Sequence, residues 1–217
     1  IDISAVGILN KDHKVGDLGV VTTFEDKTCG NRIETFFNEV GVVGHVDPAN
    51  PGIVCPDMSK LIYNQATCLL GRKNVHDNVG LVVVKGPRFS MKSESLHNQD
   101  EGWDAVGMTS LPGPFLSEEA GLCHSTLILY TDKDCCFKAY EQETDEVKAQ
   151  SVPEVMKQNV GKAVDVVGAV AGKLASMSEP CSCGCADRAK SCVVTDPDAR
   201  DPEIAARLGE HIFSENN

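Results

Sequence analysis

The densest group of residues that could do chemistry is a run of four cysteines, Cys181, Cys183, Cys185 and Cys192. Four thiolates this close in sequence could bind a tetrahedral metal such as zinc. The spacing favours another chemistry, because structural zinc sites generally use C-x₂₋₄-C knuckles and cysteines at alternate positions of an extended chain point to opposite sides. We therefore predict disulfides here and no metal site, with metal binding by these cysteines as the alternative.

A second candidate is the tripeptide Cys123-His124-Ser125. An imidazole beside a thiol can lower the pKa of the thiol and make it a nucleophile. Neighbouring residues on a strand face opposite sides, however, so adjacency in sequence does not indicate contact. A structural cysteine is the preferred interpretation of Cys123.

Common catalytic signatures are missing from the sequence. It contains no G-x-S-x-G, no H-E-x-x-H, no G-x-x-x-x-G-K-[ST] and no G-x-G-x-x-G. The six histidines are scattered and form no recognisable set of metal ligands; they are His13, His45, His76, His97, His124 and His211. We therefore predict no catalytic residue and no cofactor. An enzyme of an unrecognised family, using Cys123, His124 or scattered acids, is kept as an alternative.

Four acidic residues near the C-terminal end, Asp196, Asp198, Asp201 and Glu203, could place several oxygens around Ca²⁺. The D-x-[DN]-x-[DN]-G loop that organises such a site is absent. We expect these acids to serve in turns and as helix caps instead.

The total number of cysteines is even, and they are spread over most of the chain. Such usage favours an oxidising compartment, in which thiols pair. We predict that all ten form disulfides whose connectivity the sequence leaves open; they are Cys29, Cys55, Cys68, Cys123, Cys135, Cys136, Cys181, Cys183, Cys185 and Cys192.

The sequence starts at Ile1-Asp2 without a basic segment or an apolar signal core, which predicts a mature secreted protein after signal-peptide removal. No run of 18 or more uncharged apolar residues occurs, so no membrane span is expected. The formal net charge is −12, which repels phosphate backbones and anionic membranes. We therefore expect no nucleic acid as a partner. The predicted secretion implies an extracellular location.

Apolar patterning predicts strands in the first 150 residues. Residues 1–24 contain one or two strands, and 25–75 contain short strands separated by proline turns. The β-branched run 81–84 and the apolar run 127–130 indicate further strands. Residues 90–120 show no sustained period, and we interpret them as a long, partly ordered loop.

The period changes at Val152, after which apolar residues recur at steps of three and four as far as Met177. This pattern predicts a long amphipathic helix that begins at the N-cap Ser151, with Glu154 completing a capping box. A short helix is expected after the N-cap Asp201, with Gly209 as its stop.

Two segments of the chain share one pattern of an apolar strand and an aromatic followed by x-Asp-Lys-x-Cys. They are Val20–Cys29 and Thr126–Cys135, and the aligned pairs are Phe24 with Tyr130, Asp26 with Asp132, Lys27 with Lys133 and Cys29 with Cys135. We interpret the pattern as a strand whose aromatic enters the core, an Asp that bonds to the following turn, and a cysteine that staples the exit.

This strand-Tyr/Phe-x-Asp-x-x-Cys signature resembles a pattern of small cysteine-rich secreted proteins of fungi and, more distantly, strand segments of crystallin-like β-sandwiches. The resemblance covers about twenty residues of the 217. It implies a secreted β-rich module and no specific activity.

The predicted fold class is α+β, in three segments. Residues 1–150 form a disulfide-stapled, sandwich-like β-rich domain, 151–178 a long amphipathic helix, and 179–217 a cysteine-rich tail with a short helix.

Two features are candidate interfaces. Gly161, Gly168 and Gly172, with Val164, give the long helix a smooth stripe that permits close approach of another element. Packing on the chain's own β core is the preferred interpretation, and docking on a neighbouring subunit is the alternative. Trp103, the sole tryptophan, is the expected anchor of a contact loop.

These observations together predict a secreted, non-enzymatic protein that self-assembles into an extracellular fibre, layer or particle or adheres to a surface. The first alternative is a secreted binding module or effector that recognises a protein or surface through Trp103. The second is an enzyme of an unrecognised family.

Overall fold

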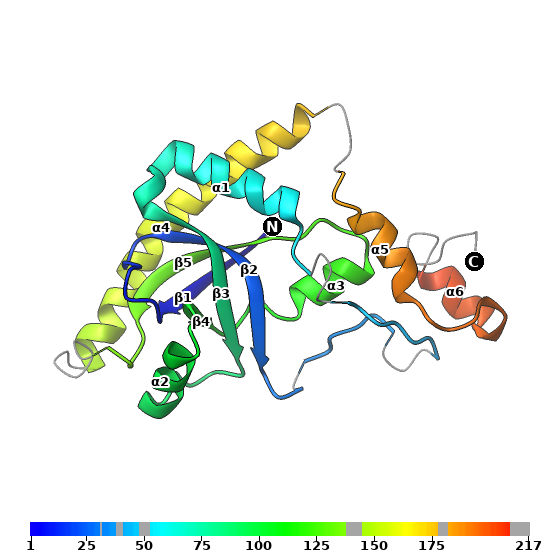
Figure 1. Ribbon diagram of the computed structural model, residues 1–217, viewed down its shortest axis with the longest axis horizontal. Coiled ribbons are helices and arrows are strands. Elements are labelled where there is room, and N and C mark those ends of the chain that lie inside the picture. The colour runs from blue at the N-terminus through cyan, green and yellow to red at the C-terminus, as the bar shows by residue number, and fades with distance from the viewer. Residues whose placement is uncertain (31, 38–40, 48–52, 138–144, 178–181, 209–217) are drawn as a thin grey trace.

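The computed structural model describes the chain except residues 31, 38–40, 48–52, 138–144, 178–181 and 209–217, and gives only the backbone for 145–152 (Figure 1). Its elements in chain order are β1 (Asp2–Ile8), β2 (Leu18–Lys27), α1 (Pro56–Leu70), η1 (Arg72–Asn74), β3 (Val75–Val84), α2 (Lys92–Asp100), β4 (Ala105–Gly107), α3 (Gly113–Glu119), β5 (Thr126–Lys133), α4 (Asp145–Ala175), α5 (Cys185–Cys192), η3 (Pro197–Ala199) and α6 (Pro202–Leu208).

The five strands close into a barrel in the order β1-β4-β3-β2-β5. Strands β2, β3 and β4 run parallel to one another, and β1 runs parallel to β5. The two groups meet in antiparallel pairs, β1 with β4 and β2 with β5. The barrel is therefore a mixed sheet without a free edge, which removes the unpaired backbone groups that an open sheet exposes.

Strand β5 is buried on both faces, which explains its uninterrupted apolar sequence. Ile128 and Tyr130 belong to a cluster that also holds Val6, Val21 and Leu81 from other strands. The alternate residues of β5 belong to a second cluster with side chains from α1 and α4; its fully buried members include Leu127, Leu129, Ile62 and Val166. Because side chains alternate across a strand, the first cluster fills the barrel and the second joins it to the helices.

Helices α1 and α4 pack on each other, α1 against β2 and β3 and α4 against β5 (Figure 1). Helix α4 buries Ala163, Val166 and Val170, which lie at steps of three and four on one face. Full burial of a valine contributes roughly 1.5–3 kcal/mol, so this stripe fixes α4 to the barrel.

The two similar segments of the sequence form β2 and β5, which are neighbours in the barrel. Both aromatics, Phe24 and Tyr130, contact the barrel core, as predicted. Asp26 also behaves as predicted, because its Oδ1 accepts a hydrogen bond from the Thr28 amide at 2.7 Å. Asp132 does not follow the pattern, since it bonds to the Thr131 hydroxyl instead.

The hydroxyl of Tyr130 is buried without a hydrogen-bond partner among the described residues. An unsatisfied buried hydroxyl costs free energy that its removal recovers. We therefore expect Tyr130→Phe to leave the free energy of unfolding within about 1 kcal/mol of the parent, or to raise it. Urea denaturation measures this, and a loss of more than about 2 kcal/mol would show that the hydroxyl has a partner.

Several predicted elements are wrong. The strands and turns predicted for 25–75 are in part α1, because Pro56 occupies the first turn of a helix rather than a turn between strands. The long loop predicted for 90–120 contains α2, β4 and α3. The long helix begins at Asp145 and not after Ser151, since the preceding residues are helix formers and Pro153 is accommodated within the helix.

The predicted fold class is also wrong. The strands form a closed mixed barrel rather than a sandwich, and none of the nine described cysteines forms a disulfide. Cys181 lies outside the described residues. The three-segment division at 150 and 178 stays a prediction.

The C-terminal region is tied back to the chain at two places. Helix α5 contacts α3 (Figure 1). In addition, Gly44 pairs with Val193 in an isolated bridge. The predicted N-cap of the short helix is confirmed, because Asp201 Oδ1 accepts from the amide of Glu203 at 2.8 Å. The predicted stop, Gly209, lies outside the described residues. No helix in the described ranges is long and apolar enough to span a membrane.

Candidate ligand pocket

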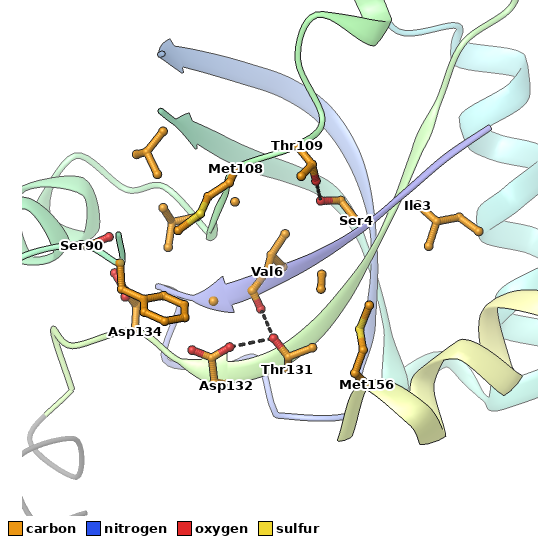
Figure 2. A pocket seen from close by; sticks show the side chains of 16 residues that line it. Ile3, Ser4, Val6, Ser90, Met108, Thr109, Thr131, Asp132, Asp134 and Met156 are labelled. Atoms are coloured by element: carbon orange, nitrogen blue, oxygen red, sulfur yellow. Dashed lines mark hydrogen bonds between the residues drawn. The ribbon is translucent and has the colours of Figure 1, made fainter. Parts of the chain in front are cut away.

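A pocket of about 370 Å³ lies where β1 meets the ends of β3, β4 and β5, with α4 at its side (Figure 2). Its lining comes from five separate segments of the chain: Ile3, Ser4, Ala5, Val6 and Gly7; Val84, Phe89 and Ser90; Val106, Gly107, Met108 and Thr109; Thr131, Asp132 and Asp134; and Met156. Its volume suits a small molecule of the size of a nucleoside.

Most of the pocket wall is apolar. Phe89 follows β3 and exposes 68% of its surface, an unusual fraction for a phenylalanine. Met108, directly after β4, and Met156, in α4, add two flexible thioethers to the wall. An exposed aromatic ring beside an apolar cavity can stack on a flat ligand such as a nucleobase.

Asp132 is held in the pocket by Thr131 (Figure 2). The Thr131 hydroxyl oxygen lies 2.6 Å from Asp132 Oδ1 and 3.1 Å from the carbonyl oxygen of Val6. The hydroxyl has one hydrogen, which it shares between these two acceptors. Burial raises the pKa of Asp132, the hydrogen bond from Thr131 opposes this rise, and the nearby charge of Asp134 adds to it.

Asp134 supplies the second carboxyl group of the pocket. It is 5% exposed, and its Oδ2 is buried with no hydrogen-bond partner among the described residues. Buried carboxylate oxygens are almost always bonded, so an unpaired one in a pocket wall marks a place for a donor from a ligand.

A pair of hydroxyls lies on another part of the wall, Ser4 from β1 and Thr109 after β4 (Figure 2). Their oxygens are 2.8 Å apart. Two adjacent hydroxyls can donate to one oxyanion. Among the lining residues in the described part of the chain, none is a lysine, arginine or histidine.

The residues singled out from the sequence lie elsewhere. Burial lowers the pKa of His124 to about 4, so its imidazole is neutral at pH 7, and its ring nitrogens contact the hydroxyls of Ser117 and Thr126. Burial raises the pKa of Cys123 well above its ordinary value. The neutral imidazole supplies no positive charge to the thiol, so the pair is not the imidazolium–thiolate pair of an activated nucleophile.

The interface candidates are outside the pocket as well. A side chain added at Gly161, Gly168 or Gly172 would meet nothing within 4 Å, and Val164 is 61% exposed, so this stripe of α4 faces away from the described chain. Trp103 is partly buried and packs beside Leu9, Val106 and Cys136. Whether these residues form interfaces stays a prediction.

The acids near the C-terminal end serve in caps, as expected. Asp196 Oδ1 accepts from the Asp198 amide at 2.9 Å, and Asp201 caps α6. The only group of three or more potential metal ligands within the described ranges consists of cysteines, namely Cys55, Cys123, Cys183 and Cys185.

The sequence and the fold correspond to a known class of enzymes. The family model described as "Phosphorylase superfamily" matches residues 1–171, and the chain belongs to this superfamily. The prediction that the protein is not an enzyme is therefore wrong.

Several individual relatives are named for the same enzyme activity. The chain is 30% identical to S-methyl-5'-thioadenosine phosphorylase of Geobacter sulfurreducens and 34% identical to that of Chloroflexus aurantiacus, each over 96% of this chain and 68% of the relative. A methylthioadenosine phosphorylase from an Antarctic soil metagenomic library has a similar structure, with a TM-score of 0.83 and 26% identity over 97% of this chain and 70% of that one.

These findings overturn the other functional predictions from the sequence. The resemblance to cysteine-rich secreted proteins of fungi is wrong, because a superfamily of metabolic enzymes matches most of the chain. The prediction of a secreted structural or self-assembling extracellular protein is wrong for the same reason, and the disulfides that supported it are absent from the described cysteines.

Sequence reasoning missed every residue of the pocket, although one signal was present. Asp132 lies near the end of the largely buried strand β5, Asp134 follows that strand directly, and Phe89 comes shortly after β3. Polar and aromatic residues at the ends of neighbouring buried strands gather at one edge of a sheet, where ligands commonly bind. The sequence pattern predicts for Asp132 a bond to the following turn instead, and it assigns no role to Asp134.

Proposed function

We propose that the protein cleaves the glycosidic bond of S-methyl-5'-thioadenosine by phosphorolysis, releasing adenine and a ribose 1-phosphate derivative. The observation that carries the proposal is a pair of carboxyl groups, the partly buried Asp132 and the buried Asp134, in a pocket with an exposed aromatic ring. The activity for which two relatives are named, each aligned over 96% of this chain, supports it.

The two carboxyl groups complement an adenine. A protonated Asp132 donates to a ring nitrogen, and the unpaired oxygen of Asp134 accepts from the exocyclic amino group. As the bond between the sugar and the base breaks, its electron pair moves to the base and the proton of Asp132 passes to the ring nitrogen. A phosphate oxygen forms the new bond to the anomeric carbon, and Asp132 regains a proton from solvent.

The hydroxyls of Ser4 and Thr109 are the proposed donors to phosphate. Since the described lining contains no cationic side chain, these hydroxyls would not balance the phosphate charge by themselves. Dependence on phosphate is therefore the property to measure first.

The test is release of adenine from S-methyl-5'-thioadenosine by the purified protein, with phosphate titrated from zero. We expect release to depend on phosphate and the sugar product to appear as a 1-phosphate in phosphorus NMR. Release at the same rate without phosphate would replace phosphorolysis by hydrolysis. No release from folded protein would contradict cleavage of this substrate.

Phe89 gives a prediction about binding of the base. Stacking of a base on an aromatic side chain contributes roughly 1–3 kcal/mol. We therefore expect Phe89→Ala to raise KM at least about fivefold with a smaller change in kcat, and Phe89→Tyr to restore KM because it keeps the ring. Steady-state kinetics measures both, and an unchanged KM in Phe89→Ala would exclude stacking.

We also propose that the protein associates with copies of itself. The support is the exposed apolar stripe of α4, with Val160 and Val164 on the surface. Light scattering across a wide concentration range tests it, and a monomer throughout would contradict it.

A further inference from the structure

Four cysteines that are far apart in sequence meet beside α5. Cys55 precedes α1, Cys123 lies between α3 and β5, and Cys183 and Cys185 lie at the start of α5. Their four sulfur atoms all lie within 4.8 Å of one another. Three separate segments therefore place four soft ligands around one point.

The spacing of the sulfurs fits a metal better than disulfides. Cys123 Sγ lies 3.4 Å from Cys183 Sγ, which lies 3.2 Å from Cys185 Sγ. A disulfide requires about 2.05 Å between sulfurs. A tetrahedral zinc ion with Zn–S bonds of about 2.3 Å requires about 3.8 Å between them.

Gly184 removes the objection that alternate cysteines point apart. Its backbone is in the left-handed conformation, with φ of 75°, and Cys185 begins a helix, so the chain is not extended here. Cys183 and Cys185 can therefore turn their sulfurs to the same side. The amide of Cys185 lies 3.5 Å from Cys183 Sγ in the same turn.

Hydrogen-bond donors surround the cluster, as expected for thiolate ligands. The amide of Met58 donates to Cys55 Sγ at 3.4 Å, and Arg188 Nη2 donates to Cys185 Sγ at 3.1 Å. Four thiolates around Zn²⁺ carry two net negative charges, which such donors and the guanidinium stabilise. A cavity of about 310 Å³ lined by Gly121, Cys123 and Cys183 gives an ion access to the cluster.

We propose that Cys55, Cys123, Cys183 and Cys185 bind one structural Zn²⁺ ion. All four positions of a tetrahedron are filled by protein sulfur, so the ion has no open position for substrate. None of the four residues lines the ligand pocket. The ion holds the start of α5 against the residue before α1 and against the turn before β5. This structural role does not depend on the proposed phosphorolysis.

The first test measures metal in the purified protein, prepared under reducing conditions without chelator, by plasma mass spectrometry. We expect one zinc per chain. Cys185→Ser is expected to lose at least about nine-tenths of the zinc, since removal of one ligand from a structural site typically abolishes tight binding. Cys68→Ser is the matched control, because Cys68 is an exposed cysteine of α1 outside the cluster, and it should retain one zinc.

The second test uses the unaltered protein, so it does not depend on folding of a variant. Alkylation followed by peptide mass spectrometry should find the four cysteines protected until a zinc chelator is added, and then modified. Modification without chelator, protection that only a reductant removes, or iron in place of zinc would each overturn the proposal. Cobalt substitution should give the charge-transfer and ligand-field bands of a tetrahedral tetrathiolate.

Discussion

Asp132→Asn is expected to lower kcat for adenine release by about 100- to 10,000-fold, the usual contribution of a positioned general acid. The amide keeps the size of the side chain and its contact with Thr131 but supplies no acidic proton to the leaving base. KM should change much less, because the neutral amide still donates a hydrogen bond to the base. Steady-state kinetics with S-methyl-5'-thioadenosine measures both constants.

A control and a second substrate separate proton donation from general damage to the pocket. Asp77→Asn changes an exposed aspartate of β3 outside the pocket and should leave kcat unaltered. A nucleoside whose base is methylated at the ring nitrogen already carries a positive charge and leaves without a proton. Asp132→Asn should cleave it nearly as fast as the parent does, and an equal loss on both substrates would contradict the role as proton donor.

The pH dependence has a defined sign. Burial raises the pKa of Asp132, and proton donation requires the protonated form. The rate should therefore be high below this pKa and fall as the pH rises through it, with the raised pKa extending activity toward neutral pH. Asp132→Asn should lose this alkaline limb, which a profile of kcat against pH would detect.

The second large effect is expected at the ion pair that joins α5 to α3. Arg188 Nε lies 2.6 Å from Glu118 Oε1, and the side chain of Glu118 is only 4% exposed. Arg188→Met would leave the carboxylate buried without its partner, which typically costs about 3–5 kcal/mol. We expect the free energy of local opening of α5 to fall by this amount. Amide hydrogen exchange in α5 and α3, compared at matched zinc content, measures the change.

A neighbouring surface pair provides the control. Lys190 Nζ lies 3.5 Å from Asp187 Oδ1 on the same helix, and both side chains are largely exposed. Lys190→Ala should change the stability by less than about 1 kcal/mol. Adding Glu118→Gln to Arg188→Met should recover part of the loss, because the buried charge is removed. Equal exchange rates in Arg188→Met and Lys190→Ala would contradict the importance of the buried pair.

Part of the fold could be predicted from local sequence. The runs around 81–84 and 127–130 are β-branched or apolar throughout, and both lie in strands. Closure of the barrel could not be predicted, since it depends on pairing of β1 with β5, which are separated by most of the barrel's sequence. The sequence does not predict helix α1, because a proline such as Pro56 is found both in turns and in the first turn of a helix.

The site was harder to predict than the fold because its residues have no common local pattern. Ser4, Phe89, Thr109 and Asp132 come from four separate segments, which only the closed barrel brings together. The cysteines were misinterpreted for a related reason. An even count is compatible with pairing and with coordination, and the spacing that distinguishes the two is set by Gly184 and by segments distant in sequence.

Strand β5 serves the core and the pocket within eight residues, since Ile128 and Tyr130 fill the barrel while Thr131 and Asp132 line the pocket. The carboxyl group of Asp132 is therefore carried by a largely buried strand, so substitutions that move it would also disturb the core. Divergence in substrate choice, whether natural or by directed evolution, should therefore concentrate at the exposed Phe89, where the side chain can vary without disturbing the barrel.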